Sequence, residues 1–347
     1  MSVDAPGISV DAASDAEVEE ALTRLLAIEP NLDYGNFQPL AARAGAAESL
    51  HRRRWLDGQG RIALLLARDR AGRPLALLRA VERPFESAHF GMRMARVEPP
   101  LASPDLEVRL PALSALYRSM CERLQGAGYV HAALRTSTRD PAAPWALQHA
   151  GALHVDTQVS WMCPLARMPH DEPLPDGLVI EQHDRTSIAN LKPESWERMA
   201  AWAGDAFDRG PLVFDLSLPR DRARSVYREW TARVMTGSWA DAVLVARHGD
   251  EVVAFISMLR LHDVSEAAGL TVCGHGLGAT LPRYRGLFTA IQREMIARRP
   301  LDADFMENET QVSTIGSINV YAKLGMRYLR STSTFHRRLD GAVRGQP

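Results

Sequence analysis

The sequence predicts an α/β protein that contains two copies of one unit, each with a mixed central sheet flanked by helices. Its 347 residues are enough for about two domains. A proline-rich stretch lies near the middle, and the two halves repeat one order of elements. The distance from Gly72 to Gly151 is 79 residues, and from Gly249 to Gly325 it is 76 residues. We interpret this agreement as an internal repeat, with chance agreement between common α/β patterns as the alternative.

In both halves a strand, a turn and a second strand come first, and a strand, a helix, a glycine and a final strand come last. Runs of apolar residues between turn residues predict the strands. In the first half these elements are Arg61–Arg68, the turn at Ala71–Gly72, Leu75–Val81, His131–Arg135, Ala143–His149, Gly151 and Val155–Met162. In the second half they are Ala242–Arg247, the turn at His248–Asp250, Val252–Met258, Asp304–Asn308, Ile315–Leu324, Gly325 and Met326–Arg338.

The halves are joined by a segment that contains three prolines between Met168 and Gly177. Because proline restricts φ, this segment predicts an extended connector. The first residues are acidic and rich in Ala and Ser, without the basic start of a secretory signal, and predict a mobile leader. The expected organisation is a leader over 1–20, a first domain over 21–165, a linker over 166–177, a second domain over 178–340 and a frayed tail over 341–347.

The composition excludes several classes of protein. Hydrophobic residues make up 46% and charged residues 24%, which is typical of globular proteins and excludes a disordered chain, a collagen or a membrane bundle. Lys and Arg number 41 against 42 Asp and Glu, for a net charge of −1. This balance argues against binding nucleic acid through a broadly basic surface, although it leaves local basic pockets open. The chain has no run of about 18 apolar residues, so we expect no membrane span.

The cysteines and histidines predict neither a disulfide framework nor a metal site. Cys121, Cys163 and Cys273 are an odd number without a CxxC motif. We therefore expect reduced thiols in a cytoplasmic protein. His275 lies between two glycines, but no second histidine or carboxylate follows at metal-ligand spacing, so we interpret it as structural.

A basic loop between a strand and a helix is the clearest chemical signal. The strand runs into Pro282, the loop contains Arg283 and Arg285, and the helix places Phe288 and Ile291 on one face. Amides at a helix N-terminus attract anions, and flanking arginines add charge-assisted hydrogen bonds. The segment therefore predicts a phosphate or pyrophosphate site. An ordinary strand–turn–helix with solvated arginines is the alternative.

This segment resembles the coenzyme A pyrophosphate loop of the GNAT acetyltransferase superfamily, whose pattern is Arg/Gln-x-x-Gly-x-Gly/Ala. Arg285 and Ala290 match, while Phe288 replaces the middle glycine, and we expect Phe288 to point into the core. The resemblance implies a tandem GNAT fold. The N-terminal copy is expected to be degenerate, because no such loop occurs between Val97 and Gln125.

A second segment, Thr310–Met326, resembles the closing strand and helix of that superfamily. Tyr321, the four-residue step to Gly325 and the apolar Met326 align with its Tyr-x-x-x-Gly-Phe pattern, whereas Thr314 stands where Asn is usual. The resemblance implies that Tyr321 lies near the thioester sulfur. On residue type alone, Tyr321 is a half-buried packing residue.

Several short segments also resemble, in the same order along the chain, those of TDP-fucosamine acetyltransferases. These enzymes acetylate the amine of a nucleotide-linked 4-amino-6-deoxysugar. The matching segments are Phe85–Gly91, Ala146–Asp156, Phe207–Arg209, Tyr227–Trp230 and Thr310–Gln311. The matches are imperfect, since Phe85, His89 and Ala152 each replace the family residue.

The resemblances imply roles for individual residues. Tyr321 would protonate the departing thiolate, and Asp156 would accept a proton from the amine, directly or through water. The residues expected to bind acetyl-coenzyme A are Ala279, Leu281, Arg283, Arg285, Gly286, Leu287, Phe288, Thr289, Ala290, Thr314 and Ser317. Those expected to bind the acceptor are Asp208, Arg209, Tyr227, Trp230 and Gln311.

We therefore expect an N-acetyltransferase that uses acetyl-coenzyme A as co-substrate, needs no metal and acts on a nucleotide-linked amino sugar by direct attack on the thioester. One alternative is a GNAT enzyme for another small-molecule or protein amine. A second is a catalytically silent acyl-coenzyme A-binding protein, favoured if Phe288 and Thr314 have eroded the site. We expect no nucleic-acid or membrane partner, and a homodimer is left open.

Overall fold

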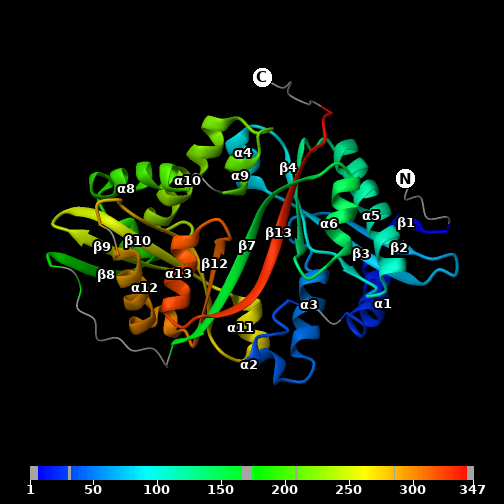
Figure 1. Cartoon of the computed structure of the whole chain (residues 1–347), viewed down its shortest axis with the longest axis horizontal. Helices are drawn as coiled ribbons and strands as arrows, with labels where there is room; N and C mark the ends of the chain where they lie inside the picture. The colour runs from blue at the N-terminus through cyan, green and yellow to red at the C-terminus, as the bar shows by residue number, and fades with distance from the viewer. Residues whose placement is uncertain are drawn as a thin grey trace. The chain divides into compact units, whose positions relative to one another are not determined.

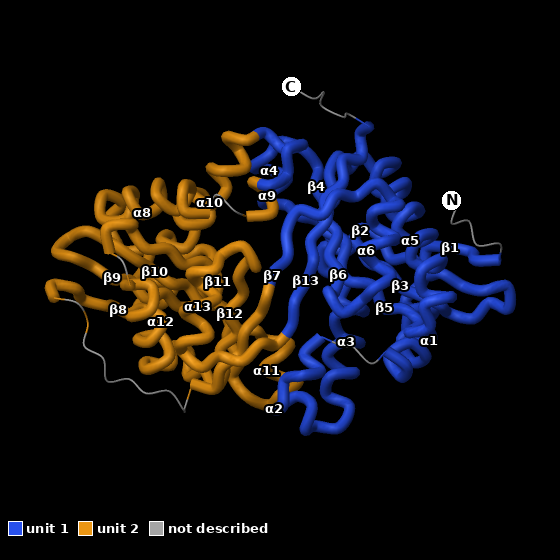
Figure 2. The backbone as a smooth tube through the Cα atoms, viewed as in Figure 1, with its two compact units in different colours: residues 1–158, 214–219, 330–347 blue, residues 159–213, 220–329 orange. Residues whose placement is uncertain are grey.

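The chain divides into two compact units, coloured blue and orange in Figure 2. The computed structural model describes residues 7–29, 33–165, 174, 176–207, 210–284 and 286–341. Unit 1 consists of residues 1–158, 214–219 and 330–347, and unit 2 of residues 159–213 and 220–329. Most of the predicted linker, the start of the leader and the end of the tail lie outside the described residues.

Unit 1 contains a mixed sheet in the order β1-β2-β3-β4-β6-β13, in which β5 also pairs with β3 (Figure 1). The strands of this unit are β1 (Ser9–Ala12), β2 (Arg61–Arg68), β3 (Pro74–Glu82), β4 (Met94–Val97), β5 (Leu101–Ala102) and β6 (His131–Ser137). Strands β4 and β6 are parallel, whereas β1–β2, β2–β3, β3–β4 and β6–β13 are antiparallel. Three elements have residues in both units: β7 (Leu153–Pro164), α9 (Pro211–Phe214) and β13 (Arg327–Arg338).

Helices cover both faces of the unit 1 sheet. They are α1 (Asp15–Leu26), α2 (Gln38–Ala41), α3 (Ala46–Leu56), α4 (Pro84–Phe90), α5 (Leu106–Gly126) and α6 (Ala142–His149). Successive strand side chains point to opposite faces, so Leu77 and Leu78 belong to different clusters. Leu78 packs with Leu113 and other residues of α5 and α6, and Leu77 packs with Leu22 of α1 and with Trp55 of α3.

The N-terminal segment differs from the mobile leader that the composition predicted. Strand β1 pairs with β2, beginning at Ser9 opposite Arg68. Helix α1 starts with a capping box, in which Ser14 and Glu17 each bind the other's backbone amide, and it buries Val18 completely. A capping box satisfies amides that a helix start leaves unpaired, and the buried apolar stripe then holds the helix on the sheet. The capping-box residues and the apolar stripe can both be read from the sequence of this segment, although its composition is acidic.

The strands of unit 2 are hydrogen-bonded in the order β12-β11-β10-β9-β8. Strands β11 and β12 are parallel and the other neighbours in this order are antiparallel. The strands are β8 (Leu178–Asp184), β9 (Ala242–His248), β10 (Glu251–Arg260), β11 (Val272–Thr280) and β12 (Phe305–Gln311). The helices are α7 (Arg185–Ala189), α8 (Pro193–Ala206), α10 (Arg220–Met235), α11 (His262–Ala268), α12 (Leu287–Arg298), the 3₁₀ helix η2 (Pro300–Asp302) and α13 (Ile315–Lys323).

The two halves share the predicted order of elements. Each has an antiparallel strand pair, β2–β3 or β9–β10, and each ends in strand, helix, glycine and strand. The glycines after α6 and α13 are Gly151, with φ of +77°, and Gly325, with φ of +70°. Glycine reaches this left-handed region without a Cβ clash, which is why it commonly follows a helix. The predicted α/β fold with a mixed, helix-flanked sheet in each copy is confirmed.

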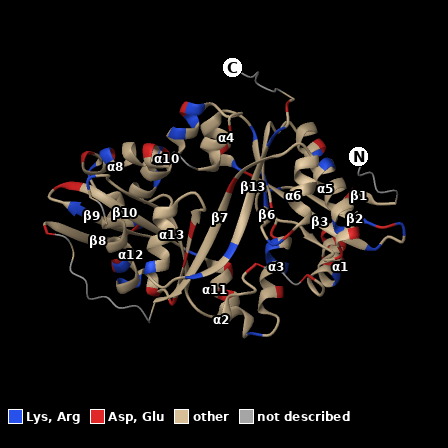
Figure 3. Ribbon diagram, viewed as in Figure 1, with Lys and Arg blue, Asp and Glu red and all other residues tan. Residues whose placement is uncertain are grey.

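Charged residues occur in both units, and Figure 3 shows basic and acidic positions interspersed on the ribbon. The chain as a whole has a net charge of −1. Among the described helices, none combines the length and the apolar content that crossing a bilayer would require.

A buried cluster attaches residues 214–219 to the rest of unit 1. The Asp215 Oδ2 atom lies 2.8 Å from His131 Nε2 and 2.8 Å from His336 Nδ1. The Ser217 hydroxyl donates to Asp215 Oδ1 at 2.6 Å. Burial opposes ionisation of Asp215, but the hydrogen bonds from both histidines outweigh it and hold the pKa of that carboxyl well below its usual range. Burial lowers the pKa of His336 to about 4, although Asp215 partly opposes this shift.

We expect the free energy of unfolding to fall as the pH is lowered from about 7 to about 4.5. Unfolded His336 binds a proton near its ordinary pKa of 6.5, whereas folded His336 binds one only near 4, so the unfolded state holds more protons between these values. This difference corresponds to a loss of about 3 kcal/mol at most. The lowered pKa of Asp215 adds a further loss only under more acidic conditions.

Urea unfolding at both pH values measures this loss. The His336→Gln variant lacks the titrating ring and should lose less stability on acidification than the wild type. The exposed His149→Gln on α6 serves as the matched control and should lose as much as the wild type. Equal losses in His336→Gln and the wild type would contradict the prediction.

Candidate functional site

The parallel strands β11 and β12 of unit 2 separate soon after they begin to pair. Their register joins Val272 to Phe305, Cys273 to Met306 and Gly274 to Glu307. Strand β11 continues to Thr280 and β12 to Gln311 without a further paired position. The separation exposes backbone polar groups of β11 along one edge, and such groups require a partner. Ligands of α/β sheets commonly bind at the carboxyl ends of parallel strands.

On its other edge, β11 is held by a side chain inserted into the ladder. The register between β10 and β11 shifts between Ile256 and Met258, at Ser257. The Ser257 hydroxyl donates to the Leu277 carbonyl at 2.9 Å and accepts from the Leu277 amide at 2.7 Å. Ser257 is fully buried. A bulge of this kind bends a strand, so this pair of hydrogen bonds fixes where β11 turns away from regular pairing.

Two glycines of β11 lie where larger residues would clash. A Cβ at Gly276 would lie 2.7 Å from Ser257 Oγ and 3.0 Å from Trp239 Cζ3. A Cβ at Gly278 would lie 2.7 Å from His275 Nε2. Both positions therefore require glycine so that neighbouring rings can approach the strand backbone.

The segment after β11 leads directly into helix α12. The Leu281 amide donates to the Val253 carbonyl at 2.9 Å, and the Trp202 indole donates to the Thr280 carbonyl at 2.8 Å. Helix α12 begins after Gly286, whose φ is +83° and which provides no side-chain cap. Arg285, the central residue of the predicted pyrophosphate loop, lies outside the described residues.

Arg283 already has surface partners within unit 2. Its guanidinium forms an ion pair with Glu251 and lies 5.1 Å from the centroid of the Tyr284 ring. Hydrogen bonding to Tyr284 and the charge of Glu251 raise the pKa of Arg283. Glu251 also accepts from Arg198 at 2.6 Å. The charge of Arg283 is therefore partly matched before any ligand binds.

The other residues predicted to bind the coenzyme differ in exposure. Ala279, Leu281, Leu287 and Ala290 are buried. Thr289, Thr314 and Ser317 are partly exposed, and Gly286 is exposed.

Phe288 is only partly buried, contrary to the expectation that it points into the core. Because α12 starts at Leu287, its inward face is formed by Leu287, Ile291 and Met295. Phe288 lies at the border of this face, where its ring centroid is 6.4 Å from that of His275.

The two predicted catalytic residues lie in different units. Tyr321 is on α13 in unit 2, where it is almost fully buried. Burial, with a smaller contribution from the charge of Glu309, raises the pKa of its phenol well above the usual range. A phenol of this kind remains protonated at neutral pH and can donate a proton. Asp156 is buried on β7 in unit 1.

Aromatic side chains connect the predicted acceptor residues to β11. The ring of Tyr227 is stacked on Phe207 at 4.8 Å and lies 5.1 Å from Trp230, between ring centroids. Trp230 is stacked on Trp239 at 6.4 Å, and Trp239 approaches Gly276. Tyr227 itself is buried.

The other residues predicted to bind the acceptor are Gln311, Asp208 and Arg209. The Thr314 hydroxyl donates to Gln311 Oε1 at 3.3 Å, so the structure brings these two residues together. Asp208 and Arg209 lie outside the described residues.

His275 is a candidate that sequence reasoning set aside. Both of its ring nitrogens are buried and have no hydrogen-bond partner within the part of the chain that the structure describes. Burial lowers the pKa of His275 to about 4, so the ring is neutral at neutral pH. A neutral imidazole can accept a proton or a hydrogen bond. A search for residues at metal-ligand spacing could not identify His275 as a site residue. Its position in a glycine-rich strand that precedes a basic loop is the sequence signal that could have identified it.

Comparison with known proteins addresses the fold. No protein-family model matches the sequence, and no curated protein is a match. A GCN5-related N-acetyltransferase from Sphaerobacter thermophilus is similar in structure, with a TM-score of 0.58 and 16% identity over 96% of each chain. A tandem GNAT protein from the clavulanic acid biosynthesis pathway is also similar in structure, with a TM-score of 0.52 and 14% sequence identity. The alignment covers 96% of this chain and 99% of that chain. The chain has the tandem GNAT fold.

A third GNAT structure is part of a larger protein. It is a glucosamine N-acetyltransferase region of a fungal multi-domain β-N-acetylglucosaminidase, with a TM-score of 0.54 and 14% identity. The alignment covers 96% of this chain and 38% of that one. At these identities the likeness concerns the GNAT fold and not the substrate.

We expect Ser257→Ala to destabilise the protein by about 2 kcal/mol. The change leaves the buried amide and carbonyl of Leu277 without their partner, and an unsatisfied buried polar group costs about 1–3 kcal/mol. Ser238→Ala is the control, because Ser238 is exposed, and should stay within about 0.5 kcal/mol of the wild type. Chemical denaturation provides both values, and equal stability of the two variants would disprove a bracing role for Ser257.

Proposed function

We propose that this GNAT protein transfers an acetyl group from acetyl-coenzyme A to an amine. The observation that carries the proposal is the early separation of β11 and β12, next to the start of α12. A strand edge with unpaired polar groups can receive an extended amide chain such as pantetheine, and the start of a helix attracts a pyrophosphate. The two features are joined by one short loop.

The residues in this part of unit 2 fit such a co-substrate. A Cβ at Gly286 would meet no atom within 4 Å, so the helix start is not crowded on that side. Arg283 and Arg285 would add charge-assisted hydrogen bonds to the phosphates. Thr314 and Ser317 would lie along the pantetheine arm. Phe288, which is only partly buried, would border the same loop.

The proposed reaction is a direct attack on the thioester. The amine nitrogen forms a bond to the carbonyl carbon, the carbon–sulfur bond breaks, and the thiolate takes the proton of the Tyr321 phenol. Burial keeps the Tyr321 phenol protonated at neutral pH, so its proton is present when the thiolate forms, but the raised pKa makes this phenol a weaker acid than an exposed one. The support for Tyr321 as the acid is therefore its place on α13, in the segment that resembles the closing helix of the GNAT superfamily. Asp156, which is buried on β7, would accept the amine proton, directly or through water.

We propose a nucleotide-linked amino sugar as the acceptor, with Tyr227, Trp230 and Gln311 among the residues that bind it together with Asp208 and Arg209. The glucosamine N-acetyltransferase region with a similar fold supports testing amino sugars first. Another amine, such as an antibiotic, an amino acid or a protein N-terminus, is the second candidate. A silent acyl-coenzyme A-binding protein is the third. We further propose a cytoplasmic enzyme, without a nucleic-acid or membrane partner and with a homodimer left open.

Release of free coenzyme A from acetyl-coenzyme A separates these candidates. The panel consists of a nucleotide-linked 4-amino-6-deoxysugar, glucosamine, an aminoglycoside, free lysine and a peptide with a free N-terminus. Thiol release with sugar amines alone supports the first candidate, and release with another amine supports the second. Binding of acetyl-coenzyme A without release for any amine supports the third.

Replacing Arg285 by Gln should weaken coenzyme A binding about tenfold or more. The change removes charge-assisted hydrogen bonds, which contribute roughly 1.5–3 kcal/mol each. Calorimetry measures the affinity, with Arg298→Gln as the control, because Arg298 lies at the far end of α12 and pairs with Glu294. Arg283→Gln should have a smaller effect than Arg285→Gln, since Arg283 is already paired with Glu251. Unchanged affinity in Arg285→Gln would remove the loop assignment.

Replacing Tyr321 by Phe should lower kcat by about 10²–10⁴-fold, the usual contribution of general acid catalysis. The ring and its packing remain, so the melting temperature and the affinity for coenzyme A should change little. Single-turnover measurements at several pH values test this, because protonation by water could otherwise mask the loss. Wild-type single-turnover rates throughout would rule out Tyr321 as the acid.

A further inference from the structure

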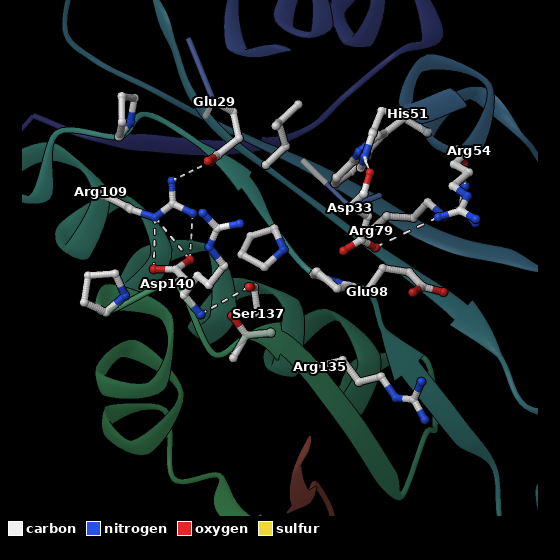
Figure 4. Close-up of a pocket in the computed structure, with 18 of the residues that line it drawn as sticks. Glu29, Asp33, His51, Arg54, Arg79, Glu98, Arg109, Arg135, Ser137 and Asp140 are labelled. Atoms are coloured by element: carbon white, nitrogen blue, oxygen red, sulfur yellow. Dashed lines mark hydrogen bonds and ion pairs between the residues drawn. The ribbon is translucent and has the colours of Figure 1, made fainter. Parts of the chain in front are cut away.

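Unit 1 contains a pocket of about 670 Å³ for which neither the sequence nor the proposed acyl transfer gives a role. Pockets that enclose small organic ligands typically have volumes of about 300–1,000 Å³. Figure 4 shows Arg109 with Asp140 on one side of this pocket, Arg79 with Glu98 on the other, and Arg135 below them. All lining residues belong to unit 1.

The floor of the pocket is formed by charged residues on three neighbouring strands. The Glu98 amide, just beyond β4, donates to the Arg79 carbonyl of β3 at 2.9 Å, which places these two residues opposite each other. Arg96 of β4 is opposite Ala133 of β6. Since alternate residues of a strand share a face, Arg79, Arg96 and Arg135 all lie on the same face of the sheet.

The pocket has more positive than negative charge. Six arginines and four carboxylates line it, so the excess is two positive charges. Arg109 is bound to Asp140 at 2.7 Å and to Glu29 at 3.0 Å, and Arg96 is bound to Glu98 at 2.6 Å. Burial lowers the pKa of His51, which leaves its ring neutral at neutral pH. The carboxylates of the pocket therefore cannot balance its arginines.

Arg79 is a lining arginine that has no carboxylate among its described hydrogen-bond partners. It is half-buried on a central strand, and its guanidinium donates to the Arg54 and Asp57 backbone carbonyls rather than to a carboxylate. Its Nε atom is buried without a partner in the described part of the chain. Burial lowers the pKa of Arg79, and the charges of Glu98 and Asp57 oppose this shift only in part. An anion in the pocket would supply further negative charge.

The pocket also has an apolar wall. Trp55 of α3, Pro99, Pro100 and Leu101 after β4, and Pro141 before α6 line it. A site for an inorganic ion alone would not need a surface of this kind, whereas a ring attached to a phosphate would bury against it.

We propose that the unit 1 pocket binds a small organic phosphate of nucleotide size, with its phosphates on the arginines of β3, β4 and β6 and its ring system on the apolar wall. The site does not depend on the proposed acyl transfer, which uses unit 2. A free nucleotide and a phosphosugar share this chemistry, and separate probes distinguish them.

The test uses the full chain without acetyl-coenzyme A, so that its outcome is independent of the unit 2 proposal. Calorimetry compares uridine 5′-diphosphate, adenosine 5′-diphosphate and glucose 1-phosphate with the uncharged nucleosides. Binding of at least one phosphate, with no binding of the nucleosides, is expected, and the tighter probe identifies the source. Hydrogen exchange should show protection in residues 96–101 and 135–141. A lack of phosphate binding, or protection elsewhere only, would overturn the proposal.

Variants of opposite charge sharpen this test. Arg135→Gln should weaken phosphate binding about tenfold or more, because it removes a charge-assisted contact, and Glu98→Gln should strengthen it by increasing the positive excess. Arg123→Gln on the exposed side of α5 makes the same charge change outside the pocket and should leave the affinity unchanged. Equal affinities in all three variants would overturn the site. If Arg135→Gln does not fold, the Glu98→Gln result and the wild-type exchange pattern decide.

Discussion

One parallel strand pair in each unit, β4–β6 in unit 1 and β11–β12 in unit 2, is the constraint on which the structure depends. Parallel neighbours cannot be joined by a tight turn, so each pair needs a crossover, and here the crossovers contain α5 and α12. Pairing ends at Val97 and Leu134 in unit 1 and at Gly274 and Glu307 in unit 2. Beyond these points the two strands of a pair no longer bond to each other, although β6, β11 and β12 each continue as a strand. The arginine-lined pocket and the proposed acetyl-coenzyme A site both lie there.

The two copies of this arrangement differ at the start of the crossover helix. In unit 1, α5 begins after Asp105, whose carboxylate accepts from the Glu107 amide at 3.1 Å. An acidic cap satisfies a free amide and repels an incoming anion. In unit 2, α12 begins after Gly286 and has no acidic residue in its first turn. The same fold therefore presents a helix start suited to pyrophosphate in unit 2, whereas unit 1 offers side-chain arginines instead.

Much of the secondary structure could be predicted from the sequence because it depends on local patterns. The strand Arg61–Arg68 is found with the predicted bounds, and Gly151 and Gly325 mark the ends of helices through their positive φ. The helix over Asp15–Leu26 could also have been predicted, since Ser14 and Glu17 have the three-residue spacing of a capping box. The prediction of a mobile leader relied on the acidic composition of the segment and overlooked this capping box.

Long-range packing limited the prediction of side-chain environments. Phe288 has the spacing of a core residue, yet it is only partly buried, because the start of α12 at Leu287 turns the inward face toward Leu287 and Ile291. The ring of His275 packs so close to Gly278 that a Cβ there would lie 2.7 Å from its Nε2 atom, and both ring nitrogens are buried without a partner in the described part of the chain. Spacing along the chain carries no information about either contact.

The sequence by itself determined the repeated order of strands and helices, the glycines that end the helices and the basic loop before α12, because each depends on the conformational preferences of neighbouring residues. Only the tertiary structure decided that β11 and β12 separate after three paired positions, and that Arg79, Arg96 and Arg135 share one face of a sheet. The physical reason is that strand register is set by hydrogen bonds between segments far apart in the chain, and a shift of one residue would move each arginine to the opposite face.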